Sequence, residues 1–179
     1  MTENGMRDER ELSLGKVDIG DPDNKQILLE QYKVFVDTME KALARRQTVN
    51  SFFLTANSLL LSASGVMAKQ TFESILALIV VLSLATTGIL LCVSWRRIIR
   101  NYRQLNAAKF DVIHRLEAYL PVALFEAEWT ALGRGEDPRK YQSISRTESA
   151  VAAVFIILYT IAIASSTVVL LICAGQGKI

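Results

Sequence analysis

Two long stretches of the sequence contain no charged residue, and they constrain the fold more than any other feature. They are residues 75–95 and 149–176, although the chain carries 20 Lys and Arg and 18 Asp and Glu elsewhere. At about 1.5 Å per residue, a helix of about 20 residues crosses the roughly 30 Å hydrocarbon core of a bilayer and satisfies its own backbone there. Buried helices of soluble bundles rarely run this far without a charge. We therefore expect two transmembrane helices.

A third stretch, residues 52–68, is also free of charge but is shorter and more polar. The six residues that follow it, 69–74, are too few to do more than turn the chain into the next span. The first two spans should therefore form a hairpin. The expected fold is an all-α integral membrane protein with three transmembrane helices.

Basic residues gather on one side of every expected span, which predicts the orientation in the membrane. The side that contains the amino terminus and the middle of the chain holds Lys41, Arg45, Arg46, Arg96, Arg97, Arg100, Arg103, Arg134, Arg139, Lys140 and Arg146. The other side holds Lys69, offset by Glu73, and Lys178. We expect a cytoplasmic amino terminus and an external carboxyl terminus, with Trp95, Arg96 and Arg97 as anchors in the lipid headgroups.

The segments outside the membrane divide the chain further. Residues 1–24 are predicted to be a disordered acidic cytoplasmic tail, and residues 25–49 a cytoplasmic amphipathic helix. Its apolar residues recur at spacings of four and three, as in a helix that packs along a seam: Leu28, Tyr32, Phe35, Met39 and Ala42. Residues 50–95 then form the transmembrane hairpin. Since no Gly or Pro interrupts residues 25–64, this helix can continue into the first span.

The middle of the chain, residues 96–148, is expected to lie in the cytoplasm. A similar apolar period predicts that the second span continues as far as Leu120, through Ile98, Tyr102, Leu105, Val112, Leu116 and Tyr119. We call the two extramembrane helices the stalk; they can pack against each other or against neighbouring subunits. Pro121 then starts a short helix, residues 122–132, with Gly133 at its carboxyl cap and a Gly/Pro turn after it. The third span, residues 149–174, and an external tail, residues 175–179, complete the chain.

The first span carries two polar stripes. Ser51, Thr55, Ser58, Ser62 and Gly65 form one, and Asn50, Asn57 and Ser64 form the other at spacings of seven. Small and hydroxyl residues let membrane helices approach closely, which predicts packing against other spans. An asparagine stripe could instead line a wet axial path in an oligomer, since an unpaired Asn facing lipid is costly. Asn50, Asn57, Ser58 and Ser64 are therefore the candidates for pore-lining or interface residues.

No residue pattern indicates catalysis. His114 is the only histidine, which argues against a histidine-based metal site or a triad within one subunit, and we expect it at the surface or in an interface, with a pH-sensing role left open. Glu126 and Glu128 are two residues apart and point in different directions on a helix, so they cannot act as a paired acid and base. Cys92 and Cys173 should lie near opposite membrane surfaces, too far apart to pair. We expect no enzyme, with no catalytic, cofactor-binding or metal-binding residue, and no nucleic-acid partner.

One segment resembles a known family. Residues 120–141, LPVALFEAEWTALGRGEDPRKY, together with RRQTVNSFF at residues 45–53, look like the RipA-type family of small bacterial octameric membrane proteins. The resemblance covers roughly residues 30–175 and implies a bacterial inner-membrane homo-oligomer of eight subunits with no known enzymatic activity. It also implies that the motif forms a cytoplasmic corner, with Trp129 as apolar anchor, from Glu128, Trp129, Gly133, Gly135, Asp137, Pro138 and Tyr141.

The layout of the amino-terminal half, a helix entering a two-span hairpin, is also similar to SLATT domains, which are two-span modules thought to form pores. Two functions therefore stay open. The oligomer is a channel or pore, as the polar first span suggests, or it is a non-conducting scaffold or adaptor that recruits a cytoplasmic protein through a collar of stalks. In both cases the expected partners are other copies of the chain and membrane lipids, and no cofactor is expected.

Overall fold

The computed structural model describes residues 21–68, 74–137 and 139–176, and within these ranges the chain is helical and contains no strand. Its elements are α1 (Pro22–Ala68), α2 (Ile75–Glu117), α3 (Leu124–Ala131), the short 3-10 helix η2 (Gly133–Gly135) and α4 (Ile144–Gly175). Most of the predicted acidic tail, residues 69–73 of the turn between the first two spans, Pro138 and residues 177–179 lie outside the described residues.

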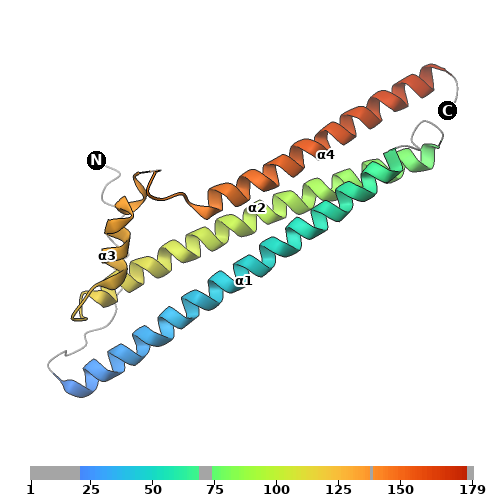
Figure 1. The fold of residues 1–179 in the computed structure, drawn as a ribbon. Helices are drawn as coiled ribbons and strands as arrows, with labels where there is room; N and C mark the ends of the chain where they lie inside the picture. Colours follow the sequence, from blue (N-terminus) through green and yellow to red (C-terminus); the bar gives the residue numbers. More distant parts are fainter. Residues whose placement is uncertain (1–20, 69–73, 138, 177–179) are drawn as a thin grey trace, which may run out of the picture.

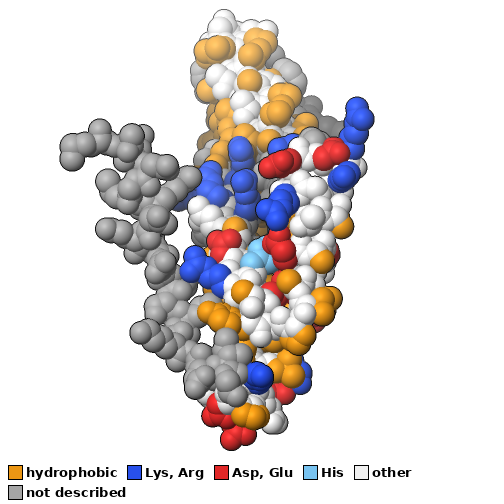
Figure 2. Space-filling model, turned by 90° about the vertical axis from the view of Figure 1, so that its left-hand side faces the viewer, with side chains coloured by type: hydrophobic (Ala, Val, Ile, Leu, Met, Phe, Trp, Pro, Cys, Tyr) orange, Lys and Arg blue, Asp and Glu red, His pale blue; other side chains and the backbone are white. Residues whose placement is uncertain are grey.

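Three of the helices, α1, α2 and α4, are long and apolar enough to cross a membrane. This confirms the predicted all-α fold with three transmembrane helices. With 47 and 43 residues, α1 and α2 are about 70 and 65 Å long, more than twice the hydrocarbon thickness. Both therefore continue without a break from the membrane into the stalk. The apolar end of the molecule is free of charge in Figure 2, and charged side chains crowd the remainder.

Helix α2 is the centre of the bundle, with α1 and α4 packed along it and little direct contact between those two (Figure 1). Its buried residues follow the alternating three-and-four spacing of a coiled-coil seam: Leu78, Val81, Ala85, Gly88, Cys92, Trp95 and Ile99. The buried residues of α4 recur mainly at every seventh position, Ser145, Ala152, Tyr159, Ser166 and Cys173. Each helix thus buries one narrow stripe and leaves the rest of its apolar surface for lipid or for other subunits.

The seam of α2 in the stalk differs from the predicted stripe. It passes through Tyr102, Asn106, Ile113 and Glu117, whereas Leu105 and Tyr119 are each 48% exposed. The seam keeps the three-and-four spacing of the membrane segment as far as Ile113, with Lys109 between Asn106 and Ile113, and reaches Glu117 four residues later. Polar residues therefore occupy three of its positions. The apolar pattern of the sequence therefore points to residues beside the seam, such as Leu105, in place of the polar residues in it. On α1 all five predicted seam residues, from Leu28 to Ala42, are buried or partly buried.

The stalk ends in an elbow that turns the chain back towards the membrane. Helix α2 ends at Glu117 rather than at Leu120, because the backbone N–H groups of Tyr119 and Leu120 donate to the carbonyls of Leu116 and Glu117 in a tighter turn. Helix α3 then packs against the end of α2, and η2 and an irregular segment lead into α4 (Figure 1).

Candidate functional site

Five polar or aromatic residues from three helices meet at the level where the spans leave the membrane, and we call them the boundary cluster: Arg46 and Asn50 of α1, Trp95 of α2, and Ser145 and Glu148 of α4. Arg46 forms an ion pair with Glu148 and donates to Ser145 Oγ over 2.8 Å. Asn50 donates to the other oxygen of Glu148 over 2.5 Å and accepts the indole N–H of Trp95 over 2.9 Å. The cluster therefore ties all three spans together at one level.

The boundary cluster is shielded from solvent. The Arg46 and Glu148 side chains are only 11% and 16% exposed. Within the described residues, the Nε of Arg46 is buried without a hydrogen-bond partner. The indole of Trp95 is 2% exposed and stacks on Phe53, with ring centroids 5.8 Å apart. Trp95 was expected among the headgroup anchors, but its ring lies inside the subunit because its N–H has a partner there.

A second cluster, which we call the intramembrane cluster, lies deeper in the membrane than the boundary cluster and also joins three helices. Asn57 of α1 is fully buried; its amide nitrogen donates to the Phe53 carbonyl over 2.8 Å and its oxygen accepts from Cys92 of α2 over 3.1 Å. The Tyr159 hydroxyl of α4 donates to the Asn57 backbone carbonyl over 2.9 Å. A Cβ at Gly88 would lie 2.2 Å from the Tyr159 ring, so the missing side chain makes room for it.

The two polar stripes of the first span face opposite ways. Asn50, Asn57 and Ser64 lie on the inner side. Ser64 is 3% exposed, and its hydroxyl donates to the Leu60 carbonyl. Ser58 lies on the outer side, together with the rest of its stripe, and all five positions of that stripe are exposed: Ser51, Thr55, Ser58, Ser62 and Gly65. The structure thus separates Ser58 from the other three candidates.

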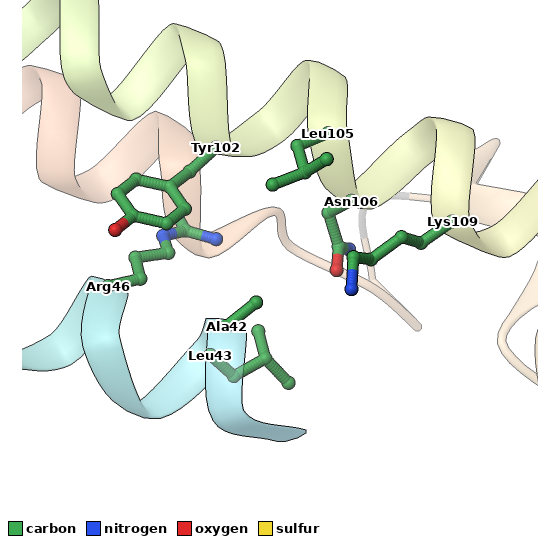
Figure 3. A pocket seen from close by; sticks show the side chains of 7 residues that line it. All are labelled: Ala42, Leu43, Arg46, Tyr102, Leu105, Asn106 and Lys109. Carbon is green, nitrogen blue, oxygen red and sulfur yellow. The ribbon is translucent and has the colours of Figure 1, made fainter. Parts of the chain in front are cut away.

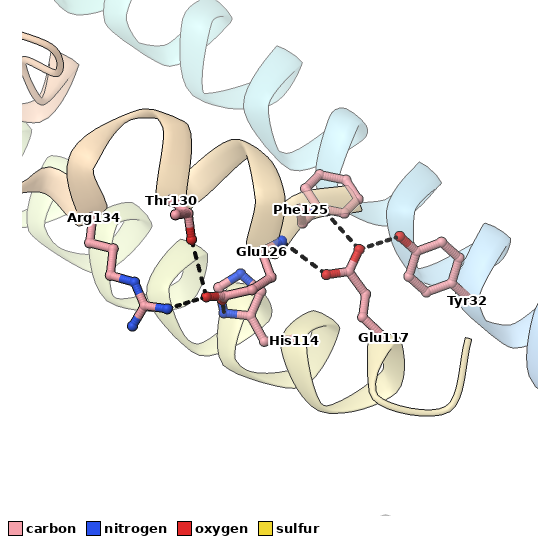
Figure 4. Close-up of polar contacts among 7 residues, drawn as sticks. All are labelled: Tyr32, His114, Glu117, Phe125, Glu126, Thr130 and Arg134. Atoms are coloured by element: carbon pink, nitrogen blue, oxygen red, sulfur yellow. Dashed lines mark hydrogen bonds and ion pairs between the residues drawn. The ribbon is translucent and has the colours of Figure 1, made fainter. Parts of the chain in front are cut away.

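A third cluster holds the elbow of the stalk (Figure 4). Glu117 is 2% exposed. Its carboxylate accepts hydrogen bonds from the backbone N–H groups of Phe125 and Glu126, over 2.8 and 3.0 Å, and from the Tyr32 hydroxyl, over 3.3 Å. Ala123, at the amino cap of α3, provides no side-chain cap, so Glu117 of α2 supplies the acceptor for the free N–H groups of α3. Burial, and then the charge and hydrogen bond of Glu117, raise the pKa of Tyr32.

His114 lies beside this elbow. Its Nδ1 is 3.6 Å from a carboxylate oxygen of Glu126, whose other oxygen binds Arg134 at 2.5 Å. The His114 ring is tilted against that of Phe110 at a centroid distance of 6.1 Å, and its side chain is 26% exposed. The histidine is therefore a contact between α2 and α3.

The turn after α3 contains three consecutive residues with positive φ, Gly133 (67°), Arg134 (54°) and Gly135 (74°). Gly135 lies against Trp129, where a Cβ would come within 3.0 Å of the indole, and Trp129 packs edge-on against Tyr141 at 5.6 Å. The Asp137 carboxylate accepts the Arg139 N–H over 2.9 Å. Of the other residues in the predicted corner motif, Glu128 is exposed and Pro138 lies outside the described residues.

A small, open pocket lies between the stalk segments of α1 and α2 (Figure 3). Its lining is Ala42, Leu43, Arg46, Tyr102, Leu105, Asn106 and Lys109. Both cations have other partners, because Arg46 pairs with Glu148 and Lys109 donates to Thr38 Oγ1 over 3.1 Å. The pocket is therefore a gap in the helix seam and offers no free charge to a ligand.

Sequence reasoning missed several residues that carry these clusters. Arg46 was noted only as one of the basic residues beside the spans, Glu148 was not singled out, and Gly88 and Tyr159 were only parts of apolar runs. Nothing in the sequence indicated that Glu117 is buried, since a single carboxylate near a helix end is usually exposed. Among the described residues, no three His, Cys, Asp or Glu lie together as a metal site would require.

The comparisons with known proteins give one match. The model of the octameric membrane protein family, 8xMP, matches residues 29–169. This range takes in the boundary cluster, the intramembrane cluster and the elbow. No curated protein and no solved structure matches the chain significantly.

Proposed function

The chain belongs to the octameric membrane protein family, and from this premise we propose that it acts as a non-enzymatic membrane scaffold that holds a cytoplasmic protein at the membrane surface. Membership confirms the resemblance seen in residues 120–141 and makes the chain an octameric membrane protein. The scaffold role goes beyond the family name and rests on how each subunit uses its polar groups.

The observation that carries the proposal is the inward position of the asparagine stripe. Asn57 is 0% exposed, and its side-chain nitrogen and oxygen both form hydrogen bonds within the subunit. The Asn50 side chain binds Glu148 and Trp95. These amides were the groups best suited to line a wet path. Because they are satisfied between helices of one chain, they favour a rigid subunit over a conducting one.

The surface available to a partner lies at the elbow. Tyr119, Val122 and Leu124 are 48, 62 and 65% exposed, and we call them the tip patch. The elbow that contains them lies at the end of the stalk away from the charge-free spans (Figure 1), so lipid does not cover it. Three exposed apolar residues within six positions at one elbow, outside the membrane, are a candidate surface for a protein contact. The tip patch therefore supports docking of a protein with an apolar surface.

The proposed setting is the bacterial inner membrane, with the stalk in the cytoplasm and the carboxyl terminus outside. The exposed arginines that follow the second span and the basic residues before the first and third spans support this orientation by their bias to one side. A periplasmic reporter enzyme fused after residue 179 should be active, and the same enzyme fused after residue 135 should be inactive. The reverse pattern contradicts the orientation.

Site-specific photo-crosslinking in cells tests the scaffold. A crosslinking residue in place of Val122 should give a covalent adduct with a second protein species, and one in place of Glu40, an exposed position on α1, should not. Leu124→Ser in the same chain should reduce the adduct. Adducts only between copies of this chain would show that the tip patch is a subunit contact, which contradicts the proposal.

A pore is the second candidate, and one observation favours it. The outer stripe, from Ser51 to Gly65, presents hydroxyl groups on the surface of the subunit. If this face lines the axis of the octamer, Ser58→Leu should lower ion flux through liposomes that contain the protein. Ser83→Leu, at an exposed hydroxyl of α2, is the control. Equal flux for both variants and the unchanged chain argues against a pore lined by this stripe.

A further inference from the structure

Four arginines follow the end of the second span within eight residues of helix α2. Arg96, Arg97, Arg100 and Arg103 are all exposed. Within the described residues, none of these four arginines has a carboxylate partner, unlike Arg46 and Arg134. Unpaired guanidinium groups gathered on one helix face are a strong cationic surface. Figure 2 shows Lys and Arg side chains next to the charge-free end of the molecule.

The arginines continue an apolar stripe of the span itself. Leu90 and Val93 are 63% and 39% exposed. Leu90, Val93, Arg97 and Arg100 follow each other at spacings of three, four and three, which places them on one face of the helix. Arg96 and Arg103 lie next to this face, both on the same side of it. One continuous surface therefore presents apolar groups inside the membrane and two cations just outside it.

The depth of the cations matches the headgroup layer. The charge-free segment of α2 ends at Trp95, a member of the boundary cluster, so we place the membrane surface at this residue. At about 1.5 Å per residue, Arg97 lies about 3 Å and Arg100 about 7.5 Å beyond Trp95. The headgroup region on each side of a bilayer is roughly 5 to 8 Å thick. Both guanidinium groups therefore lie at the level of lipid phosphates.

The direction of α2 also points these side chains towards the lipid. Cα–Cβ bonds in a helix tilt towards its amino terminus. The amino-terminal part of α2 is in the membrane, so its arginines lean back towards the headgroups. Arg45 of α1 and Arg146 of α4 belong to helices whose amino ends lie in the stalk or in the middle segment, so they lean away from the membrane.

We propose that the outer face of α2 is a binding site for an anionic phospholipid. Arg97 and Arg100 bind the headgroup phosphates, Leu90 and Val93 contact an acyl chain, and Arg96 and Arg103 add charge on one side. Guanidinium groups suit phosphate because they offer paired N–H donors in a plane. The site does not depend on the scaffold proposal, since it lies on a different surface from the tip patch.

The test is native mass spectrometry of the intact octamer in detergent with added phosphatidylglycerol or phosphatidylcholine. The unchanged protein should retain phosphatidylglycerol in preference, and Arg97→Gln with Arg100→Gln should weaken this binding about tenfold. Arg139→Gln with Lys140→Gln removes the same charge from exposed positions after the elbow and should change little. Arg97→Lys with Arg100→Lys keeps the charge but loses the paired donors, and should weaken the binding less than the glutamine variant does.

Three results would overturn the site. Equal binding of the two lipids by the unchanged protein would show that headgroup charge is not recognised. Loss of the octamer in the Arg97→Gln and Arg100→Gln variant, with the lysine variant intact, would assign the face to a subunit contact. Displacement of phosphatidylglycerol by inorganic phosphate alone would indicate a general anion site.

Discussion

Tyr159 lies directly against Gly88, with the ring so close that a Cβ on Gly88 would be 2.2 Å from it. The same tyrosine donates its hydroxyl to the Asn57 carbonyl over 2.9 Å. One side chain of α4 therefore packs into the space that Gly88 leaves on α2 and forms a hydrogen bond with α1. This contact sets the spacing of all three spans inside the membrane.

Gly88→Ala should destabilise the bundle. Alanine favours a helix by about 1 kcal/mol over glycine, but the added methyl group overlaps the Tyr159 ring, and overpacking of a core costs about 1 to 3 kcal/mol. The clash should prevail, with a net loss measured as a lower midpoint of thermal unfolding in detergent. Gly65→Ala is the matched control, because nothing lies within 4 Å of a Cβ there. Equal stability of the two variants would contradict the contact.

The boundary cluster should be sensitive to the loss of one charge and tolerant of the loss of both. Glu148→Gln leaves Arg46 without its counter-charge in a place where the side chain is 11% exposed, and this should cost about 3 kcal/mol of unfolding free energy. Arg46→Met combined with Glu148→Leu should recover much of that loss, since apolar replacements of a buried pair are often neutral.

An exposed ion pair in the stalk provides the control for this experiment. Asp37 and Lys41 are 2.6 Å apart, with side chains 53% and 64% exposed. Asp37→Asn should therefore change stability by less than about 1 kcal/mol. Chemical unfolding followed by tryptophan fluorescence measures all three variants. If Glu148→Gln were as mild as Asp37→Asn, the boundary cluster would not act as a lock between α1 and α4.

The elbow should lose stability at alkaline pH through Tyr32. Its pKa is raised above the ordinary 10.0 by burial and by the Glu117 carboxylate. A group whose pKa is higher in the fold stabilises it below the unfolded pKa, and this contribution disappears as pH rises through the folded pKa. The Tyr32 contribution should therefore be complete at neutral pH and fade above pH 10. Tyr32→Phe should remove this part of the alkaline dependence, as measured by unfolding at pH 8 and pH 11.

The sequence predicted the parts of this fold that depend on periodicity and length. The two charge-free segments, the continuous helices and the turn after α3 follow from apolar spacing, from the lack of Gly and Pro, and from the two glycines that adopt positive φ. The sequence did not show which of the two polar stripes faces the inside of the subunit. Asn57 and Ser58 are neighbours in sequence, and only the packing of α2 and α4 decides that Asn57 is buried and Ser58 exposed.

Other features depend on partners that are distant in sequence. Glu148 is 102 residues from Arg46, and Glu117 is 85 residues from Tyr32. No local pattern pairs them, and each is a single charge next to a long helix. Gly88 was unremarkable in an apolar run because its role appears only when the Tyr159 ring lies on it. The stalk seam differed from the prediction because Asn106 and Glu117 occupy buried or partly buried positions that an apolar pattern does not reveal.

The corner motif can be tested at Gly135. Its φ of 74° is unfavourable for any residue with a Cβ, and that atom would lie 3.0 Å from the Trp129 ring. Gly135→Ala should cost about 1 to 2 kcal/mol from the backbone alone. Faster hydrogen exchange in α3 than in the unchanged chain would show the effect. Gly175→Ala, with no atom within 4 Å of the new Cβ, should leave exchange in α3 unchanged.

Asn57→Leu and Ser58→Leu together separate packing from conduction. Asn57 makes its hydrogen bonds inside the subunit, so leucine there should remove the contact with Cys92 and lower thermal stability. Flux through liposomes should stay the same, because the scaffold proposal assigns no conduction to this residue. Ser58 is exposed, so Ser58→Leu should leave the stability of the subunit fold nearly unchanged. A large change in flux with Asn57→Leu at unchanged stability would mean that the asparagine stripe lines a path for ions, and the scaffold proposal would then fail.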